Sequence, residues 1–457
     1  MSVSPLRSLV SFVKAMPPQK HESSTRLCLL DALGCILYGA SLAEGNVIIR
    51  SIEAFGAGSI PLPGSLVSLT PDSAAYAMGT LCHLRELDDV HVSIIHPGAV
   101  IVPAALSAAY TLNLSLGEML DAIFYGYEVA ARISRGIGYL KHREQGWHGT
   151  STICPFGVAM AVSDLLKLEE TETVWALGIA GTRSGGTWAF AADGAMTKRL
   201  HPGMAARDGL QAAFLARSGI TGPQHILEAE DGGLYRIMSR DWDLSKLCEE
   251  GQIPAVSDVE FKWYASCKSV HSPQEAATTI YQKRVASGLS LAPTAIRVQI
   301  NSSAMHMAGR MYDPSSITSA QLSIPYGIAL ALSGRDGSAG NYSEDFLTVR
   351  QLYTLASMVQ MEVSAEMDNL RAQEHTSSAI VEVTWDDQTV SREFVKAAKG
   401  SIERPLSRDE IVRKFESLVI PVVGEAACRR IIEMVLTADR STQITSLEED
   451  LRPHRRD

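Results

Sequence analysis

The segment of the sequence best suited to proton transfer is a short polar stretch in an Ala- and Leu-rich region. It reads Glu86-Leu87-Asp88-Asp89-Val90-His91 and leads to His96-Pro97-Gly98. Carboxylates beside imidazoles fix the tautomers of the rings and raise their basicity, as general acid–base chemistry requires. The alternative is a helix C-terminus with solvated acids and a capping histidine. The segment therefore predicts either a proton-transfer site or a charged helix end.

Three further polar segments carry histidines or lysines. The segment around His148 leads into an apolar helix whose first amides would suit a carboxylate, unless Thr150 or Ser151 simply caps that helix. Thr197–His201 places two cations before a long helix, where a solvated surface loop is the default expectation. Lys262–His271 combines cations, an aromatic ring and a thiol at a predicted domain junction, and junctions favour ligand clefts.

Other chemistries fit the residues less well. Asp88, Asp89, His91 and His96 are plausible metal ligands, yet no HxxxH or HExxH spacing occurs, and this mixture of residues is not diagnostic of a metal site. Cys154 and Cys267 are possible nucleophiles, but their helical or apolar context favours inert thiols. No GxSxG elbow, P-loop or GxGxxG motif is present.

The composition limits the class of protein. The chain has 457 residues, with 41 basic and 51 acidic side chains and a net charge of −10. This length suggests two or three domains, and 46% hydrophobic residues exclude global disorder. Without a basic block, we expect no nucleic-acid partner. The longest apolar runs, such as residues 99–110, are too short to span a bilayer, so we expect no membrane partner.

The cysteines and the N-terminus bear on the compartment. Seven scattered cysteines with no CxxC spacing indicate reduced, mostly buried thiols and offer no frame for an iron–sulfur cluster. Residues 1–20 lack acids, so a transit peptide is conceivable. The helical spacing of Leu6, Leu9, Val10 and Val13 favours a first core helix instead. We therefore expect a cytoplasmic protein, with a mitochondrial location as the alternative.

The elements that must position these residues change in character along the chain. Apolar periodicity predicts helices over 24–40, 72–86, 102–113, 117–134, 152–167, 172–182 and 204–218. After about residue 258, alternation predicts a strand over 296–300 and a hairpin over 380–394, with helices over 318–333 and 347–361 between them. A capping box at 407–410 opens a helix, and the last helix lies near 424–437.

Taken together, these segments resemble the MmgE/PrpD family, which includes 2-methylcitrate dehydratases, cis-aconitate decarboxylases and iminodisuccinate epimerases. The combination is specific to the family and extends over about residues 25–335. The matching stretches are LLDALGCILYGA, LDDVH…HPGAVIVPAAL, GWHGTSTICPFGVAMAV, ALGIAG, DGAMTKRLHPGMAARDGL, KWYASCKSVHSPQEA and AQLSIPYGIALAL.

The resemblance implies a mainly α fold. A large all-helical domain would be formed by both chain ends (1–258 and 403–457), with an inserted smaller α+β lid domain (259–402). It also implies a homodimer with its active site between domain and lid, a small polycarboxylate substrate, and neither metal nor organic cofactor.

The resemblance further implies roles for individual residues. Family members make or quench a carbanion next to a carboxylate, which nearby cations stabilise. His96 would transfer the proton, oriented by Asp88 or Asp89, and His148 would be the partner acid. Lys198 also matches a family site position and would bind a substrate carboxylate. The remaining roles are looser: substrate binding for Lys268, His271 and His91, and a hydrogen bond or second proton from Tyr326.

Two positions depart from the family pattern. Val90 stands where decarboxylase-like members carry a threonine hydroxyl, and Glu86 stands where many relatives have aspartate. We therefore predict a cofactor-free lyase that dehydrates a 2-methylcitrate-like alkylcitrate. The alternatives are decarboxylation of a cis-aconitate-like acid, epimerisation of an iminodisuccinate-like acid, or a catalytically silent binding relative. The retained histidines and lysine argue against the silent relative.

Overall fold

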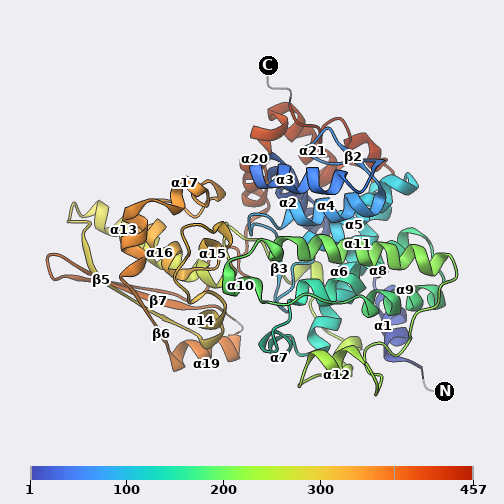
Figure 1. The fold of residues 1–457 in the computed structure, drawn as a ribbon, viewed down its shortest axis with the longest axis horizontal. Helices are drawn as coiled ribbons and strands as arrows, with labels where there is room; N and C mark the ends of the chain where they lie inside the picture. Colours follow the sequence, from blue (N-terminus) through green and yellow to red (C-terminus); the bar gives the residue numbers. More distant parts are fainter. Residues whose placement is uncertain (1–2, 375, 455–457) are drawn as a thin grey trace.

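The computed structural model describes residues 3–374 and 376–454 and is mainly helical, with 59% helix and 10% strand. Figure 1 shows the helices of the first half gathered on one side and a small sheet on the other. The predicted mainly α class with a small sheet region is therefore confirmed. The domain boundaries at 258/259 and 402/403 stay a prediction.

The first half of the chain is a bundle around long buried helices. Helices α5 and α8 are apolar on nearly every side and bury almost all their residues, as their composition predicts. Helix α11 packs against α4, α5, α8 and α9. The elements are α1 (Pro5–Lys14), η1 (Pro18–His21), α2 (Glu22–Ser41), α3 (Ala43–Glu53), β1 (Ala57–Pro61), β2 (Ser68–Leu69), α4 (Pro71–Cys82), β3 (Val90–His91), α5 (Gly98–Leu112), α6 (Leu116–Gly136), α7 (Tyr139–Glu144), α8 (Gly149–Leu165), α9 (Glu170–Thr182), α10 (Phe190–Asp193), α11 (Thr197–Arg217), α12 (Leu234–Met238), η2 (Leu244–Cys248) and η3 (Ala255–Ser257).

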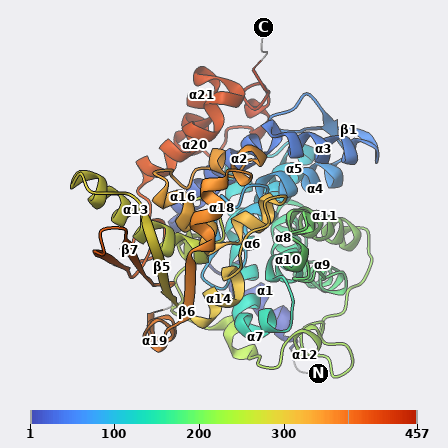
Figure 2. The same ribbon diagram turned by 60° about the vertical axis from the view of Figure 1, so that its left-hand side comes forward.

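The C-terminal helices return to this bundle. Helices α20 (Arg408–Val423) and α21 (Glu425–Thr437) pack against α2 and are followed by η5 (Ile444–Leu447). Figures 1 and 2 show α20 beside α2. Ser407 and Glu410 form the predicted capping box of α20. Lys414 on α20 donates to Asp31 on α2 at 2.6 Å, in a buried ion pair.

Residues between these helical segments form the α+β part. Its sheet has the order β6-β5-β7-β8, with β5 and β6 parallel and the other pairs antiparallel. Helix α13 packs against β7 and β8, and the predicted hairpin is confirmed. The elements are β4 (Val259–Glu260), α13 (Lys268–Ala286), β5 (Pro293–Ile300), α14 (Ser302–Ala308), α15 (Ile317–Gln321), α16 (Ile324–Leu332), η4 (Ala339–Asn341), α17 (Glu344–Leu347), α18 (Arg350–Ser357), β6 (Val359–Val363), α19 (Ala365–Glu374), β7 (Ala379–Trp385) and β8 (Val390–Val395).

Two helix predictions in this part are wrong in detail. The helix expected over 318–333 is split, because Ser323 caps a new helix and Pro325 occupies its first turn. The helix expected over 347–361 ends at Ser357, because Val359–Val363 pairs in parallel with β5. Pairing with a neighbouring strand overrides the local helical pattern there.

Two further corrections concern the polar segments. The helix expected over 72–86 ends at Cys82, and Glu86 lies in a turn with φ of +53°. The segment from Thr197 is the first turn of α11 and not a surface loop, and Lys198 and Arg199 are buried. Both corrections bring charged side chains into the interior.

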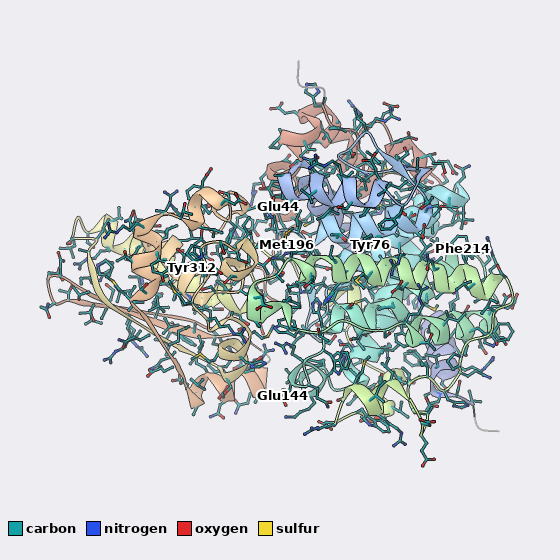
Figure 3. All side chains as sticks on the ribbon, viewed as in Figure 1. Glu44, Tyr76, Glu144, Met196, Phe214 and Tyr312 are labelled. Atoms are coloured by element: carbon teal, nitrogen blue, oxygen red, sulfur yellow. The ribbon has the colours of Figure 1, made fainter. Side chains whose placement is uncertain are left out.

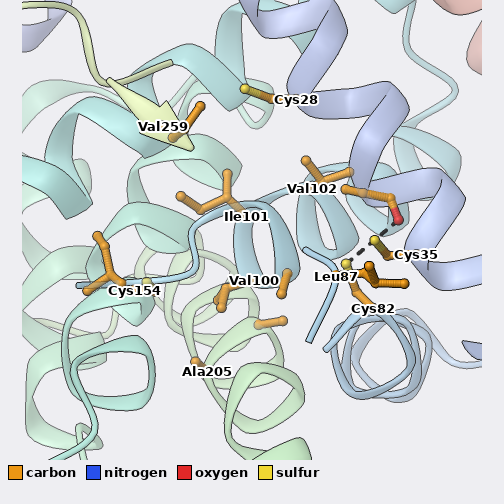
Figure 4. Close-up of a cluster of buried hydrophobic side chains, with 14 of the residues drawn as sticks. Cys28, Cys35, Cys82, Leu87, Val100, Ile101, Val102, Cys154, Ala205 and Val259 are labelled. Atoms are coloured by element: carbon orange, nitrogen blue, oxygen red, sulfur yellow. Dashed lines mark hydrogen bonds between the residues drawn. The ribbon is translucent and has the colours of Figure 1, made fainter. Parts of the chain in front are cut away.

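The helical and α+β parts meet along a short antiparallel pairing of β3 with β4. In Figure 3, Met196 at the start of α11 lies on the side of the helical part that faces the α+β part. All seven cysteines are free thiols and six are buried, as expected. Figure 4 shows Cys28, Cys35, Cys82 and Cys154 in the apolar interior. Among the described residues, no single helix is long and apolar enough to cross a membrane, and one bent pair, Pro18–Ser41 with Ala43–Glu53, passes by length and composition alone.

Candidate active site

A cavity lies at the junction of the helical and α+β parts. The helical part contributes Glu86, His91, His96, His148 and Lys198 to its walls. The α+β part contributes further cations, and both parts contribute apolar side chains. These additional lining residues include Val90, Val92, Ile94, Trp188, Lys262, Cys267, Lys268, Ser269, Met307 and Leu322. The cavity therefore gathers residues from all four polar segments of the sequence.

Glu86 is the centre of a buried charge cluster. Its carboxylate accepts hydrogen bonds from Lys198 and Arg199, which follow one another on α11, and from Lys262 at 2.9 Å. Burial acts to raise the pKa of Glu86, but the surrounding cations hold it well below its usual value. Glu86 itself adopts a left-handed backbone conformation, which is uncommon for a non-glycine residue. Gln321 extends the cluster by accepting from Arg199 at 2.5 Å.

Asp88 lies beside this cluster and holds two histidines. One oxygen, Oδ2, is 2.8 Å from Nδ1 of His83 and 3.1 Å from Nδ1 of His96. Burial acts to raise the pKa of Asp88, but the neighbouring imidazoles and Lys262 hold it well below its usual value. The carboxylate is therefore ionised, accepts a hydrogen bond from His83 and lies within ion-pair distance of His96.

This arrangement sets the tautomer of His96. Its Nδ1 also lies 2.8 Å from the carbonyl oxygen of Asp89, so both neighbours of Nδ1 are acceptors and the hydrogen resides there. The side chain lines the cavity, which leaves Nε2 with a lone pair for a substrate proton. Burial lowers the pKa of His96, so the resting ring is neutral.

His148 is the N-cap residue of α8, so the alternative in which Thr150 or Ser151 caps this helix is wrong. Its Nδ1 lies 2.9 Å from Nδ1 of His201, so one ring donates to the other. Burial and the charge of Lys198 hold the pKa of His148 well below its usual value. Its ring makes an edge-on contact with Trp188, which also lines the cavity.

Asp89 faces away from the cavity, in contrast to Asp88. One oxygen accepts from the backbone N–H of Gly98 at 2.9 Å, and the other accepts from the Tyr127 hydroxyl at 2.8 Å. Burial, with the nearby charge of Asp31, raises the pKa of Asp89 to about 7. The structure therefore places Asp89 as the anchor of the first turn of α5.

The predicted substrate-binding residues are only partly brought together. Lys198 and Lys268 line the cavity, and Lys268 Nζ is buried without a hydrogen-bond partner, 3.5 Å from Glu260 Oε2. Burial lowers the pKa of Lys268. His91 also lines the cavity, but its Nδ1 accepts from the backbone N–H of Ser93 at 3.1 Å.

His271 and Tyr326 are not among the residues that line the cavity. His271 Nε2 donates to the carbonyl oxygen of Ser266 at 3.2 Å, and its ring meets Tyr264 edge-on. The hydroxyl of Tyr326 donates to the carbonyl oxygen of Asn341 at 2.7 Å. Both side chains are fully buried within the α+β part, so their contacts indicate structural roles.

The potential metal ligands in the described residues are His83, Asp88 and His96, whose ligating atoms lie within 4.8 Å of one another. Both rings turn a protonated Nδ1 toward the same carboxylate oxygen. Lys198 is 3.1 Å from His83, and Lys262 bonds to adjacent Glu86. These positive charges oppose binding of a cation. Asp89 and His91 do not belong to this group, because the Asp89 carboxylate bonds to Gly98 and Tyr127 and His91 Nδ1 bonds to Ser93.

Comparison with known proteins identifies the family. The model of the MmgE/PrpD N-terminal domain matches residues 8–246, and that of the MmgE/PrpD C-terminal domain matches residues 264–440. The chain belongs to the MmgE/PrpD family. Among curated MmgE/PrpD-like relatives, a cis-aconitate decarboxylase of Aspergillus terreus (strain NIH 2624 / FGSC A1156) is 28% identical over 444 residues, covering 92% of this chain and 89% of that protein. Human cis-aconitate decarboxylase is 26% identical over 376 residues, covering 81% of this chain and 77% of that protein.

Sequence reasoning missed four buried residues of this MmgE/PrpD site. We assign no role to His83 or Lys262 from the sequence, although Lys262 begins the stretch KWYASCKSVHSPQEA and His83 is three residues before Glu86. Arg199 and His201 were seen only as part of a polar segment. The available signal was the density of charge in stretches that otherwise encode buried helices.

Proposed function

We propose that this MmgE/PrpD protein is a lyase that decarboxylates a cis-aconitate-like tricarboxylate. The observation that carries the proposal is the cavity itself, in which Lys198, Lys262 and Lys268 lie on the same walls as His96 and His148. Ammonium groups suit several carboxylates of one small substrate, and the imidazoles suit proton transfer. The names of the relatives from Aspergillus terreus and human support this choice of reaction.

The reaction requires one proton and releases one molecule of CO₂. A proton is added to an alkene carbon, and the electron pair of the breaking C–CO₂ bond forms a new double bond at the neighbouring position. His96 delivers that proton from Nε2 after it has taken one up, while Asp88 stabilises the transient imidazolium. The proton consumed in each turnover comes from water, and His148 is the partner that takes it up and passes it on. Lys198 and Lys268 hold the remaining carboxylates, which favours charge development next to them.

A second candidate is dehydration of an alkylcitrate, supported by the apolar surface of the cavity. Val90, Val92 and Ile94 line the cavity from the helical part, and Met307 and Leu322 line it from the α+β part. An alkyl substituent would bury apolar area there, worth about 0.8 kcal/mol per CH₂ group. The absence of a hydroxyl at Val90 is consistent with an alkyl group at this place.

Proton NMR in D₂O separates these candidates. The purified protein is incubated with cis-aconitate, methylcitrate, citrate and iminodisuccinate, with and without a chelator. Decarboxylation gives a new alkene product carrying one deuterium, together with bicarbonate. Dehydration of methylcitrate gives an alkene with no loss of carbon. No change in any of the four acids, with none of them raising the melting temperature, would refute both candidates.

A further inference from the structure

His83 is a buried histidine that does not reach the cavity. It follows the last residue of α4, is fully buried, and is not among the residues that line the cavity. Its backbone carbonyl accepts from Arg199 at 3.3 Å. Its imidazole nevertheless lies between two groups that matter for the proposed reaction, Asp88 and Lys198.

The direction of both hydrogen bonds follows from chemistry. An ammonium group only donates, so Nε2 of His83 accepts from Lys198 Nζ at 3.1 Å. An ionised carboxylate only accepts, so Nδ1 donates to Asp88 Oδ2 at 2.8 Å. The ring is therefore neutral and carries its hydrogen on Nδ1. Burial, aided by the charge of Lys198, lowers the pKa of His83 to about 3, so the ring stays neutral at working pH.

The bond to His83 limits where Lys198 can point. An ammonium group has three N–H donors on a flexible stem. One is directed to Glu86 and one to His83, which leaves one for the cavity that Lys198 lines. Two fixed acceptors on the inner side thus orient the third donor toward a ligand. A lysine with only one such acceptor would rotate more freely.

We propose that His83 is a positioning residue that holds the Lys198 ammonium group toward a substrate carboxylate and ties it to the carboxylate that orients His96. This inference rests on the proposed function of the cavity. The link is short, because Oδ2 of Asp88 is shared by His83 and His96. The imidazole of His83 therefore fixes the position of the Lys198 ammonium group relative to the carboxylate that orients His96.

Several charged groups face His83 and belong to the argument. Glu86 Oε1 is 3.4 Å from Nε2, and the rings of His96 and His148 have centroids 4.6 Å and 6.3 Å away. Lys198 and Arg199 approach from α11. The acids favour a protonated ring, whereas burial and the cations oppose it, and the donor geometry of Lys198 requires the neutral form.

Two substitutions separate the two bonds of His83. His83→Asn keeps a donor near the position of Nδ1, toward Asp88, and loses the acceptor for Lys198. His83→Gln keeps an acceptor near the position of Nε2, toward Lys198, and loses the donor to Asp88. We expect His83→Asn to raise KM for cis-aconitate about tenfold, the equivalent of about 1.4 kcal/mol. We expect His83→Gln to lower kcat with KM within about threefold of wild type.

A merely structural role would not produce this split. The inference would be overturned if both variants showed the same fall in kcat and the same rise in KM, and if these changes followed the fall in their melting temperatures. Wild-type kinetics in both variants would overturn it as well. If the unmodified protein neither binds nor converts cis-aconitate, the proposed function fails by that observation alone.

A measurement without substrate then still tests His83. In protein with ¹⁵N-labelled histidine, the His83 signals are assigned by their loss in His83→Gln. We expect a neutral ring with hydrogen on Nδ1 that does not titrate between about pH 5.5 and 8.5. Lys198→Met should shift the Nε2 resonance. A ring that titrates in this range, or a resonance unmoved by Lys198→Met, would overturn the inference independently of any activity.

Discussion

The two walls of the cavity differ in how their charges are balanced. On the helical wall, Glu86 is paired with Lys198 and Arg199, and Lys262 reaches across to the same carboxylate. On the α+β wall, the Nζ of Lys268 is buried without a hydrogen bond, and its ion-pair partner is Glu260 at 3.5 Å, which also lines the cavity. One wall is a network of short ion pairs, and the other presents a cation held by a single longer ion pair.

This difference suggests a division of labour within the proposed reaction. Buried ion pairs are costly to assemble but hold their members in fixed directions, which is what proton transfer needs. A buried ammonium that makes no hydrogen bond and only one long ion pair adds little to the stability of the fold and suits an incoming carboxylate. The helical wall would thus carry out the chemistry, and the α+β wall would select and hold the substrate. Substitutions on the two walls should therefore have effects of different kinds.

The largest effect is expected for His96→Asn on the helical wall. Asparagine keeps a donor toward Asp88 but offers no basic nitrogen to the cavity. General acid–base groups contribute about 10²- to 10⁴-fold, so kcat should fall by at least about 10²-fold. KM should change by less than about threefold. Steady-state kinetics on the substrate found by NMR measures both, and near-normal turnover would remove His96 from the mechanism.

Glu86→Gln tests the closed network of the same wall. It removes the shared partner of Lys198, Arg199 and Lys262 and leaves three buried cations uncompensated. Breaking one side of a buried ion pair costs about 3–5 kcal/mol, so the denaturation midpoint should fall clearly. Glu86→Asp is the matched control, because it keeps the charge and should lose less. Equal stability of Glu86→Gln and wild type would show that the network does not hold this wall together.

Lys268→Met should have a much smaller effect on stability. It replaces an ammonium group that makes no hydrogen bond and only a 3.5 Å ion pair to Glu260 with an apolar side chain of similar length, so the melting temperature should stay nearly constant. KM should increase about tenfold while kcat remains within about threefold, because a binding contact is lost. Lys283→Met, on the exposed part of α13, is the control. An unchanged KM for Lys268→Met would contradict the role given to the α+β wall.

The sequence predicts the elements of the helical part well and the site in part. Apolar periodicity places α2, α5, α6, α8, α9 and α11, because buried helices repeat a strong local pattern. It fails at β6, which exists because Val359–Val363 pairs with a distant strand. It also fails at the end of α4, where the helix stops at Cys82 and Glu86 adopts a left-handed conformation.

The site residues also fall into two groups, those that local motifs reveal and those that only contacts in the fold reveal. His96, His148 and Lys198 are recognisable because they lie in motifs with several matching neighbours. Asp88 and Asp89 are adjacent in the chain and cannot be told apart by residue type, yet one orients histidines and the other anchors α5. His83 becomes important only through contacts with groups from other elements. Long-range contacts of this kind leave no periodic signal in a single sequence.

The smallest effect on activity is expected for Asp89→Asn, which separates the two neighbouring acids. Asparagine can still accept from the Gly98 N–H and can donate to the Tyr127 hydroxyl, so kcat should remain within about threefold of wild type. Asp88→Asn, which disturbs both histidines, should instead lower kcat by at least about tenfold. Comparable losses in the two variants would show that Asp89 also takes part in the reaction.

The pH dependence of stability gives Asp89 a second, independent signature. Its pKa in the folded protein is raised to about 7, mainly by burial, so the folded state holds a proton that the unfolded chain has already released. The stability that this neutral acid contributes is present at low pH and is lost as pH rises toward 7. One pH unit is worth about 1.4 kcal/mol and Asp89 is half ionised at its pKa, so wild type should lose about 2 kcal/mol relative to Asp89→Asn between about pH 5 and 7. Parallel melting curves for the two proteins across this range would mean that Asp89 is already ionised in the fold, and that the first turn of α5 is anchored by a charge.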